Sequence, residues 1–393
     1  MNVALIDSGE ELAAWCSRID SAGVVALDTE FHNERSYAPR LMVIQFAVDG
    51  AVALVDALRI ADLTPLARAL ASKEIVGHAL VGDLRIFVDR FDMLPRAAFD
   101  TQLAAAFLGY GISISLADLV HDMVGVRLRK AQTVSDWSAR PLSPAQIDYL
   151  VSDVAHLLPM RERLIARLEA RGREAWYAEE ARELTDPARY RSDPERLYLR
   201  LPGAARMNRR ELGILRELAV LRDRLARERD VPPKYIIPDD AMGTLVHLRP
   251  RSFVDLAQLR RLDVGARKAY GEQILAAVAR GLALDDADLP QKPSRPPSQD
   301  REAIVTCLSV LTSAIAREQG VPSSLLAPRG TLERVARELP ATEEALASTL
   351  DGSAWRTELL VQPLYDLLHG KTALAVHGAE RGMPRVARVP LPE

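Results

Sequence analysis

Several common chemical signatures are missing from this sequence. Its 393 residues contain two cysteines, Cys16 and Cys307, which lie far apart in the chain and form neither a disulfide framework nor a zinc-binding pattern. The histidines His32, His78 and His121 match no zinc spacing either. A Walker-type glycine loop is also absent, so the sequence gives no support for ATP hydrolysis.

The start of the chain lacks the pattern of a secretory signal. Residues 1–14 include Asp7, Glu10 and Glu11 and have no basic region followed by an apolar core. We therefore expect a cytoplasmic protein that does not associate with membranes. Nothing in the sequence indicates an obligate protein partner.

Charge is distributed unevenly along the chain. The overall net charge is −3, and 48% hydrophobic with 27% charged residues is ordinary for a soluble globular protein of two to four domains. Residues 1–155 carry 13 Lys and Arg against 20 Asp and Glu, whereas residues 206–280 carry 16 against 10. The acidic part suits a metal site built from carboxylates, and the basic part suits a polyanion. Arginine-rich helices with solvated faces are the alternative interpretation of the basic part.

Local composition suggests the domain boundaries. Residues 1–110 alternate short apolar strands with helical stretches, which is typical of an α/β domain. We predict no strand after about residue 111. Residues 285–300 are poor in apolar residues and rich in Pro, Ser and Asp, which indicates a linker. The tail from residue 376 is expected to be loosely ordered.

A short repeat spans this linker. Residues 226–232 (ARERDVP) are echoed 90 residues later by residues 316–322 (AREQGVP). The echo predicts two copies of one helical module. The first copy is strongly basic and the second is not, so we expect the second to keep the fold with a different surface. Chance similarity of two arginine-rich helices is the alternative.

The most informative segment is residues 24–31 (VVALDTEF). Four apolar residues indicate a buried strand, and the period of two places Asp28 and Glu30 on the same side beyond it. Two adjacent carboxylates repel each other unless a cation neutralises them, and Mg²⁺ or Mn²⁺ prefers such oxygen ligands. A solvated loop after the strand would explain the pair equally simply, so other carboxylates must decide.

A helix over residues 143–158 provides the second signal. Ser143 suits the N-cap and Pro144 the first helical position, while Tyr149 and Asp153 share a face away from the apolar stripe. Packing for the tyrosine and solvation for the aspartate remain the alternative. A further acid, Asp83, follows an apolar strand that ends at residue 78.

Together these segments resemble the Asp-Glu-Asp-Asp 3′→5′ exonuclease family, and within it the bacterial ribonuclease D family. The similarity is carried by residues 27–31 (LDTEF), residues 77–79 (GHA) followed by Asp83, and the Tyr149-x-x-x-Asp153 spacing of the tyrosine subclass. Further similar runs are 37–41 (YAPRL), 100–104 (DTQLA) and 132–137 (QTVSDW). Residues 237–238, 248–250 and 270–274 are similar to the helicase-and-ribonuclease-D C-terminal (HRDC) module.

The resemblance implies a fold and a division of the chain. The fold class is an α/β ribonuclease-H-like mixed-sheet exonuclease domain followed by two small all-α helical modules. The expected segments are an exonuclease domain (1–175), a connecting helical segment (176–205), a first nucleic-acid-binding module (206–284), a linker (285–300), a second, degenerate module (301–372) and a tail (373–393).

The resemblance also implies an activity and its residues. Two divalent metal ions, Mg²⁺ or Mn²⁺, are expected: one held by Asp28, Glu30 and Asp153, the other by Asp28 and Asp83, with Tyr149 orienting the attacking water. The expected reaction releases 5′-mononucleotides from RNA 3′ ends, including tRNA precursors and other structured RNAs. A proofreading-type DNA exonuclease and a non-catalytic RNA-binding adaptor are the alternatives.

Candidate substrate contacts fall into two groups, for each of which a structural or solvated role is the alternative. Those expected near the carboxylates are Thr29, Phe31, His78, Lys130 and Arg140. Those expected on the basic module are Arg209, Arg210, Lys234, Arg251 and Lys268.

Overall fold

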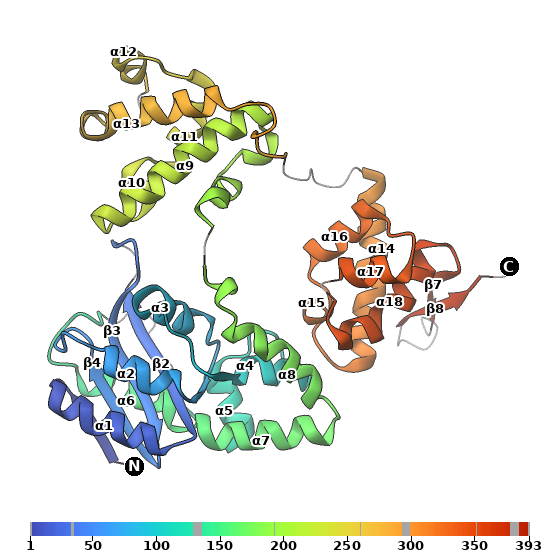
Figure 1. The fold of residues 1–393 in the computed structure, drawn as a ribbon. Helices are drawn as coiled ribbons and strands as arrows, with labels where there is room; N and C mark the ends of the chain where they lie inside the picture. Colours follow the sequence, from blue (N-terminus) through green and yellow to red (C-terminus); the bar gives the residue numbers. More distant parts are fainter. Residues whose placement is uncertain are drawn as a thin grey trace.

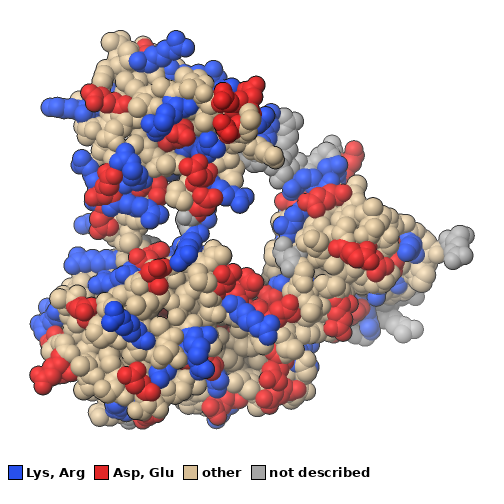
Figure 2. All heavy atoms as spheres, viewed as in Figure 1, with Lys and Arg blue, Asp and Glu red and all other residues tan. Residues whose placement is uncertain are grey.

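The computed structural model describes residues 2–32, 35–128, 136–191, 193–259, 261–292, 299–350, 352–377 and 385–391. The described chain forms an α/β domain and two helical modules, which surround an opening in the space-filling view (Figures 1 and 2).

A six-stranded mixed sheet is the centre of the α/β domain. Its order is β1-β4-β3-β2-β5-β6, in which β2, β3 and β4 are antiparallel neighbours and β1, β5 and β6 each run parallel to the strand beside them. The strands are β1 (Asn2–Ile6), β2 (Val24–His32), β3 (Arg40–Val48), β4 (Ala51–Asp56), β5 (Glu74–Gly77) and β6 (Ala97–Asp100). This mixed sheet confirms the expected fold class, although β1 and β6 were not predicted from the sequence.

Helices cover both faces of this sheet, as the long buried strands require. One core cluster joins the sheet to the first three helices: α1 (Gly9–Ser21), α2 (Thr64–Ala71) and α3 (Val81–Phe91). A second core cluster includes the next five helices: α4 (Thr101–Phe107), α5 (Leu116–Val124), α6 (Pro144–Ala155), α7 (Leu157–Ala170) and α8 (Glu174–Arg182). The predicted helix over 143–158 is therefore two helices that meet at His156.

Short 3₁₀ turns connect this domain to the first helical module. They are η1 (Glu183–Thr185), η2 (Pro187–Arg189), η3 (Pro194–Arg200) and η4 (Ala204–Arg206). The last two pack into the core of the first module through residues such as Tyr198 and Ala204.

The two helical modules repeat one another with a constant offset. The first comprises α9 (Arg209–Arg229), α10 (Pro233–Ile236), α11 (Asp239–Leu248), α12 (Phe253–Ala257) and α13 (Val264–Ala283). The second comprises α14 (Gln299–Gln319), α15 (Ser323–Leu326), α16 (Arg329–Glu338), α17 (Glu343–Thr349) and α18 (Ala354–Leu368). Each helix of the second module begins 90 residues after its counterpart, and the residues that follow the long first helices, Asp230 and Gly320, both have positive φ. The predicted repeat is confirmed.

A β-hairpin follows the second module. Strands β7 (Thr372–His377) and β8 (Arg385–Pro390) pair antiparallel, and β8 lies against α14. The prediction of no strand after residue 111 was wrong, and so was the expectation of loose order for the strand residues beyond 376. Residues 385–390 (RVARVP) contain two β-branched valines but show no strict alternation of polar and apolar side chains, so their sequence gives only a weak strand signal.

The second module also packs directly on the α/β domain. Trp355 of α18 is 2% exposed and stacks on Trp176 of α8, with ring centroids 5.4 Å apart. Its indole N–H donates to Glu180 Oε1 at 3.0 Å, and Phe107 of α4 meets the same ring edge to face at 5.3 Å. One continuous core therefore includes the sheet, α4 to α8 and the second module. Among the described helices, none is both long and apolar enough to cross a membrane.

Candidate active site

Strand β2 places the first two carboxylates near the middle of the sheet. Asp28 lies opposite Gln45 of β3, and Gln45 Nε2 donates to Asp28 Oδ2 at 2.5 Å. The register between β2 and β3 shifts between Glu30 and Phe31, an irregularity of the kind that redirects side chains next to functional sites. Asp28 and Glu30 therefore both lie in β2, a strand between β3 and β5, and not in a solvated loop after the strand.

The turn after β5 brings Asp83 to the same place. A side chain at position 77 would collide with Leu80, so glycine is required there. Ala79 has a φ of 60°, and its backbone N–H donates to Asp100 Oδ1 at 3.0 Å, which holds this left-handed turn. Asp83 then lies in the first turn of α3, 7% exposed, where Thr29 Oγ1 donates to its Oδ1 at 2.5 Å.

Helix α6 supplies the remaining two site residues. Ser143 caps the helix, Gln146 completes a capping box and Pro144 occupies the first turn, as the sequence predicted for Ser143 and Pro144. Tyr149 and Asp153 lie one turn apart on the same face of the helix, and each shifts the pKa of the other. Oδ2 of Asp153 is buried and has no protein partner.

The carboxylates form one cluster. Oxygen atoms of Asp28, Glu30 and Asp153 all lie within 4.8 Å of one another. Burial, together with the negative charges of Asp153 and Asp83, raises the pKa of Glu30 to about 8. Burial likewise raises the pKa of Asp83 to about 7 and that of Asp153 to about 7. The pKa of Asp28 rises well above its ordinary value through burial and through its three carboxylate neighbours.

These features fit a site for divalent cations. Buried like charges are costly unless they are paired or bind a metal. The donor set is oxygen only, which suits Mg²⁺ or Mn²⁺. The unpartnered Asp153 oxygen gives the same indication, because a buried polar atom without a partner in the protein is expected to have one in the working molecule.

Tyr149 is held by aromatic packing from the segment before α6. Its ring lies 5.7 Å from that of Trp137, which is largely buried. Burial and the carboxylates of Asp153, Glu30 and Asp28 raise the pKa of Tyr149. The phenol therefore stays protonated at neutral pH and is a hydrogen-bond donor there.

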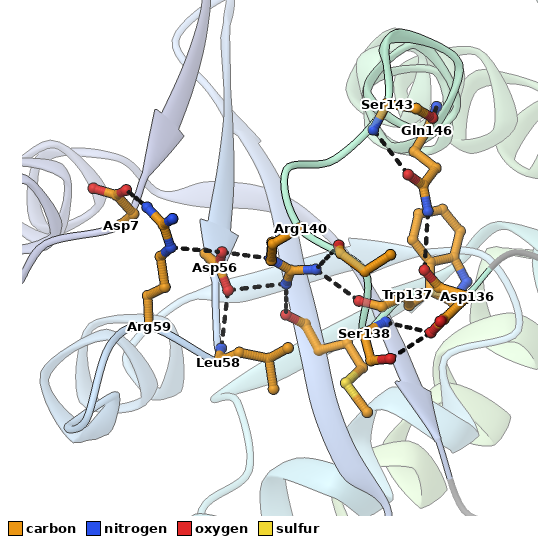
Figure 3. A network of polar contacts seen from close by, with 12 residues as sticks. Asp7, Asp56, Leu58, Arg59, Asp136, Trp137, Ser138, Arg140, Ser143 and Gln146 are labelled. Atoms are coloured by element: carbon orange, nitrogen blue, oxygen red, sulfur yellow. Dashed lines mark hydrogen bonds and ion pairs between the residues drawn. The ribbon is translucent and has the colours of Figure 1, made fainter.

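Arg140 anchors this segment to the end of β4, where it contacts Asp56 (Figure 3). Its Nε and Nη2 donate to the carboxylate of Asp56 at 2.5 and 2.9 Å, and Nη2 also donates to Met42 O. Nη1 donates to the carbonyls of Trp137 and Ala139. All five N–H groups have partners, so the expected phosphate contact is replaced by a structural role that fixes Trp137 behind Tyr149.

The other four residues expected near the carboxylates are Thr29, Phe31, His78 and Lys130, and the three that the structure describes have different surroundings. Thr29 is buried and bonded to Asp83, while Phe31 is partly buried against the core. His78 has Nδ1 2.9 Å from Thr101 Oγ1 and Nε2 2.9 Å from Ile114 O, which is the structural role weighed as the alternative. Lys130 lies outside the described residues.

The basic residues of the first module divide into two groups. Arg209 donates to the carbonyls of Asp286, Leu289 and Pro290, and Arg210 forms an ion pair with Asp286, so both hold the segment after α13 against α9. The exposed residues are Lys234, Arg251 and Lys268. Only this second group keeps the position expected of phosphate contacts.

Sequence reasoning missed two supporting residues. Gln45 is fully buried and is the one polar residue in the apolar run at 41–48 of β3, which was the available signal. Asp56 ends β4 and pairs with Arg140, which is 84 residues away. No local pattern could have revealed this pair.

Comparisons with known proteins identify the family of the chain. A family model for a 3′-5′ exonuclease matches residues 3–169, and a model for the HRDC domain matches residues 211–278. Ribonuclease D of Granulibacter bethesdensis is 38% identical over 382 residues, which cover 96% of this chain and 95% of that protein. Ribonuclease D of Acidiphilium cryptum is 38% identical over 381 residues, with 95% of both chains covered.

A solved structure extends the agreement to the whole fold. The crystal structure of Escherichia coli RNase D, an exoribonuclease involved in structured RNA processing, matches with a TM-score of 0.81 and 30% identity. The match covers 94% of this chain and 99% of that one. The chain described here belongs to the ribonuclease D family of 3′→5′ exoribonucleases.

Proposed function

We propose that the protein uses two divalent metal ions to release 5′-mononucleotides from RNA 3′ ends, with tRNA precursors among its substrates. The observation that carries this proposal is the buried cluster of Asp28, Glu30 and Asp153, in which one oxygen of Asp153 has no protein partner. Asp83 adjoins the cluster through Thr29.

The carboxylates divide between the two ions. Asp28, Glu30 and Asp153 would hold one, and Asp28 with Asp83 would hold the other. Divalent ions in such a pair stabilise the attacking and the leaving oxygen of an in-line displacement at phosphorus. Gln45 fixes one oxygen of Asp28, and Thr29 fixes one oxygen of Asp83, so both carboxylates are oriented before substrate arrives.

Tyr149 orients the water that attacks the terminal phosphodiester. Its raised pKa excludes a role as general base at neutral pH, but its hydroxyl can donate or accept one hydrogen bond at a fixed place beside Asp153. Thr29 and Phe31, which flank Glu30 on β2, are the proposed neighbours of the terminal nucleotide.

A structured RNA substrate is supported by the basic module. The net charge of residues 206–280 is +6, whereas residues 1–155 carry −7, so an RNA is attracted mainly by the first module. Figure 2 shows many of its basic side chains on the visible face. We include in this proposal a cytoplasmic location and the division of the chain given by the sequence, with boundaries at 175, 205, 284, 300 and 372.

The test combines substrate, metal and site variants. End-labelled tRNA precursor and a single-stranded DNA of matching sequence are incubated with Mg²⁺, Mn²⁺ or EDTA. Asp28→Asn and Asp153→Asn keep the size of the side chain but remove the ligand charge, and we expect a loss of turnover of roughly 10³-fold or more. Asp20→Asn, at an exposed position on α1, is the matched control and should retain full activity.

Three results would contradict the proposal. Undiminished activity of Asp28→Asn or Asp153→Asn would remove the assigned metal site. Equal or faster cleavage of DNA would favour the proofreading-type alternative. RNA binding without any cleavage in the presence of either metal would leave an adaptor.

A further inference from the structure

The connection between β2 and β3 contacts the first helical module at Tyr37. The backbone N–H of Tyr37 donates to Asp230 Oδ1 at 3.1 Å, and its hydroxyl donates to Asp223 Oδ1 at 2.7 Å. The guanidinium carbon of Arg227 lies 4.9 Å from the centre of the tyrosine ring. Figure 1 shows the hairpin of β2 and β3 directed toward this end of α9.

The side of α9 that faces Tyr37 carries a buried hydrogen-bond acceptor for it, Asp223. Asp223 is 7% exposed, although an aspartate on a surface helix is ordinarily solvated. One of its oxygens accepts the tyrosine hydroxyl, and the other accepts Arg227 Nε at 2.9 Å. The ring of Tyr37 packs against the core of the first module, so the contact combines apolar burial with a charge-assisted hydrogen bond.

The position of Tyr37 connects this contact to the active site. Tyr37 comes seven positions after Glu30, on the chain that follows β2. The first module is also attached through the connecting segment, in which Tyr190 is buried in the core of the α/β domain and Glu195 forms an ion pair with Arg216 of α9 at 3.4 Å. Two separate attachments therefore fix the orientation of the basic module relative to the carboxylates.

We propose that Tyr37 is a positioning residue that holds the basic module in the orientation in which one long RNA contacts both that module and the active site. The inference rests on the proposed function, because it assumes RNA on the basic module. Loss of the contact leaves the active site complete but lowers the fraction of molecules with the module correctly placed. The apparent affinity for long RNA falls in proportion to that fraction.

The test uses the full chain and two lengths of substrate. Tyr37→Ala removes every side-chain contact and should raise KM for tRNA-length RNA by about tenfold or more, with kcat unchanged. Tyr37→Phe keeps the ring beside Arg227 and should raise KM by about threefold. Neither variant should change kcat or KM for a short oligonucleotide, which reaches only the active site.

The matched control is Tyr110→Phe. Tyr110 donates to Asp122 and accepts from Arg167, so it has the same chemistry as Tyr37, but all three residues lie within the catalytic domain. Its loss should leave KM for long RNA unchanged. Small-angle scattering without RNA supplies a second measurement, in which Tyr37→Ala should increase the radius of gyration and Tyr110→Phe should not.

The outcomes distinguish this inference from the proposed function. A wild-type protein that does not cleave the short oligonucleotide with metal would refute the proposed function itself. Cleavage of both substrates by wild type, with an unchanged KM for long RNA in Tyr37→Ala, would refute the positioning role alone. A loss of kcat on the short oligonucleotide would show that Tyr37 acts directly at the active site, which would overturn the inference.

Discussion

The two helical modules have the same helices at a constant spacing of 90 residues, and each approaches the catalytic domain with the same end of its long first helix. In the first module this end presents Asp230 to Tyr37. In the second module the equivalent residue is Gly320, whose carbonyl lies against Gly109, and the preceding Gln319 accepts a hydrogen bond from Arg173. One architecture has thus been attached twice to one domain through equivalent points.

The two attachments differ in kind. The second module shares an apolar core with the catalytic domain, centred on Trp355, where the first module has Gly265 at the equivalent position. The first module keeps a separate core, and among the residues that the structure describes Tyr37 is the one from the catalytic domain that packs against it. The exposed basic residues Lys234, Arg251 and Lys268 have as their counterparts Ser324, Ala341 and Glu358. The second copy is packed as a structural part of the catalytic domain, and the first carries the exposed basic residues that we propose attract RNA.

If the modules serve structure and RNA binding, the chemical step should depend on residues of the catalytic domain. Tyr149→Phe tests this expectation and has the largest expected effect. Loss of the hydroxyl should lower turnover by roughly 10²–10⁴-fold on short and long RNA alike, because it removes the group that orients water. Metal affinity should stay close to wild type, since the carboxylates are unchanged. Initial rates at saturating RNA and metal measure the effect, and a wild-type rate would mean that Tyr149 only packs against Trp137.

The shared core predicts a second large effect, this time on stability. Trp355→Ala should cost about 3–5 kcal/mol of unfolding free energy and should lower the temperature at which exonuclease activity is lost. Ile274→Ala removes a fully buried side chain from the first module and should cost about 2–5 kcal/mol in that module alone. Calorimetry combined with activity on a short oligonucleotide after heating separates the two. Equal loss of activity in both variants would show that the catalytic domain and both modules unfold as one cooperative unit. The two modules would then not differ in how they are attached to that domain.

Much of this arrangement could be predicted from the sequence, because it depends on local patterns. Each local feature depends on a short stretch of sequence with a clear pattern. Examples are the strand before Asp28 and Glu30, the N-caps of α4 and α6, and the 90-residue echo. Asp100, for example, directly precedes α4 and caps it by accepting from the backbone N–H groups of Gln102 and Leu103, as an aspartate at this position favours. The mixed sheet and the repeated module followed from these local signals.

The parts that could not be predicted depend on pairs far apart in the chain. Arg140 was a candidate for phosphate binding until the structure placed Asp56 beside it. Arg209 and Arg210 were candidates for the same reason, yet they bind the chain after α13. Charge alone does not distinguish an arginine that binds a ligand from one that binds its own backbone. The spacing of Tyr37 and Asp223, 186 residues apart, is equally invisible in the sequence.

The buried carboxylates predict a pH dependence confined to the catalytic part of the molecule. In the unfolded chain these groups lose their protons near pH 4, whereas burial raises the folded pKa of Glu30 to about 8 and those of Asp83 and Asp153 to about 7. The folded state therefore holds more protons between these values, and without metal its unfolding free energy should fall as pH rises from about 4 to 8.

Metal should reverse this trend, because it binds the deprotonated carboxylates. Melting temperatures in EDTA and in Mg²⁺ or Mn²⁺ across this pH range measure both effects. In EDTA the decline should be weaker in the double variant Asp28→Asn, Asp153→Asn, and absent from the transition of the first module. A melting temperature in EDTA that rises over this range would contradict the assignment of raised pKa values.

The smallest expected effects come from substitutions of single basic residues. These substitutions test directly whether the basic surface of the first module, which the second module lacks, binds RNA. Each phosphate that a side chain neutralises releases counterions, so removing one contact should make the slope of log affinity against log salt shallower by about 0.7 on single-stranded RNA. Lys234→Ala, Arg251→Ala and Lys268→Ala should each show this change with long RNA, and the triple variant should show roughly their sum. Arg317→Ala is the matched control, because it removes an exposed arginine from the second module, at the position equivalent to Arg227. Its slope should equal that of wild type. A slope that falls equally in the control and in the three variants would mean that both modules hold RNA, and the division of roles between them would not stand.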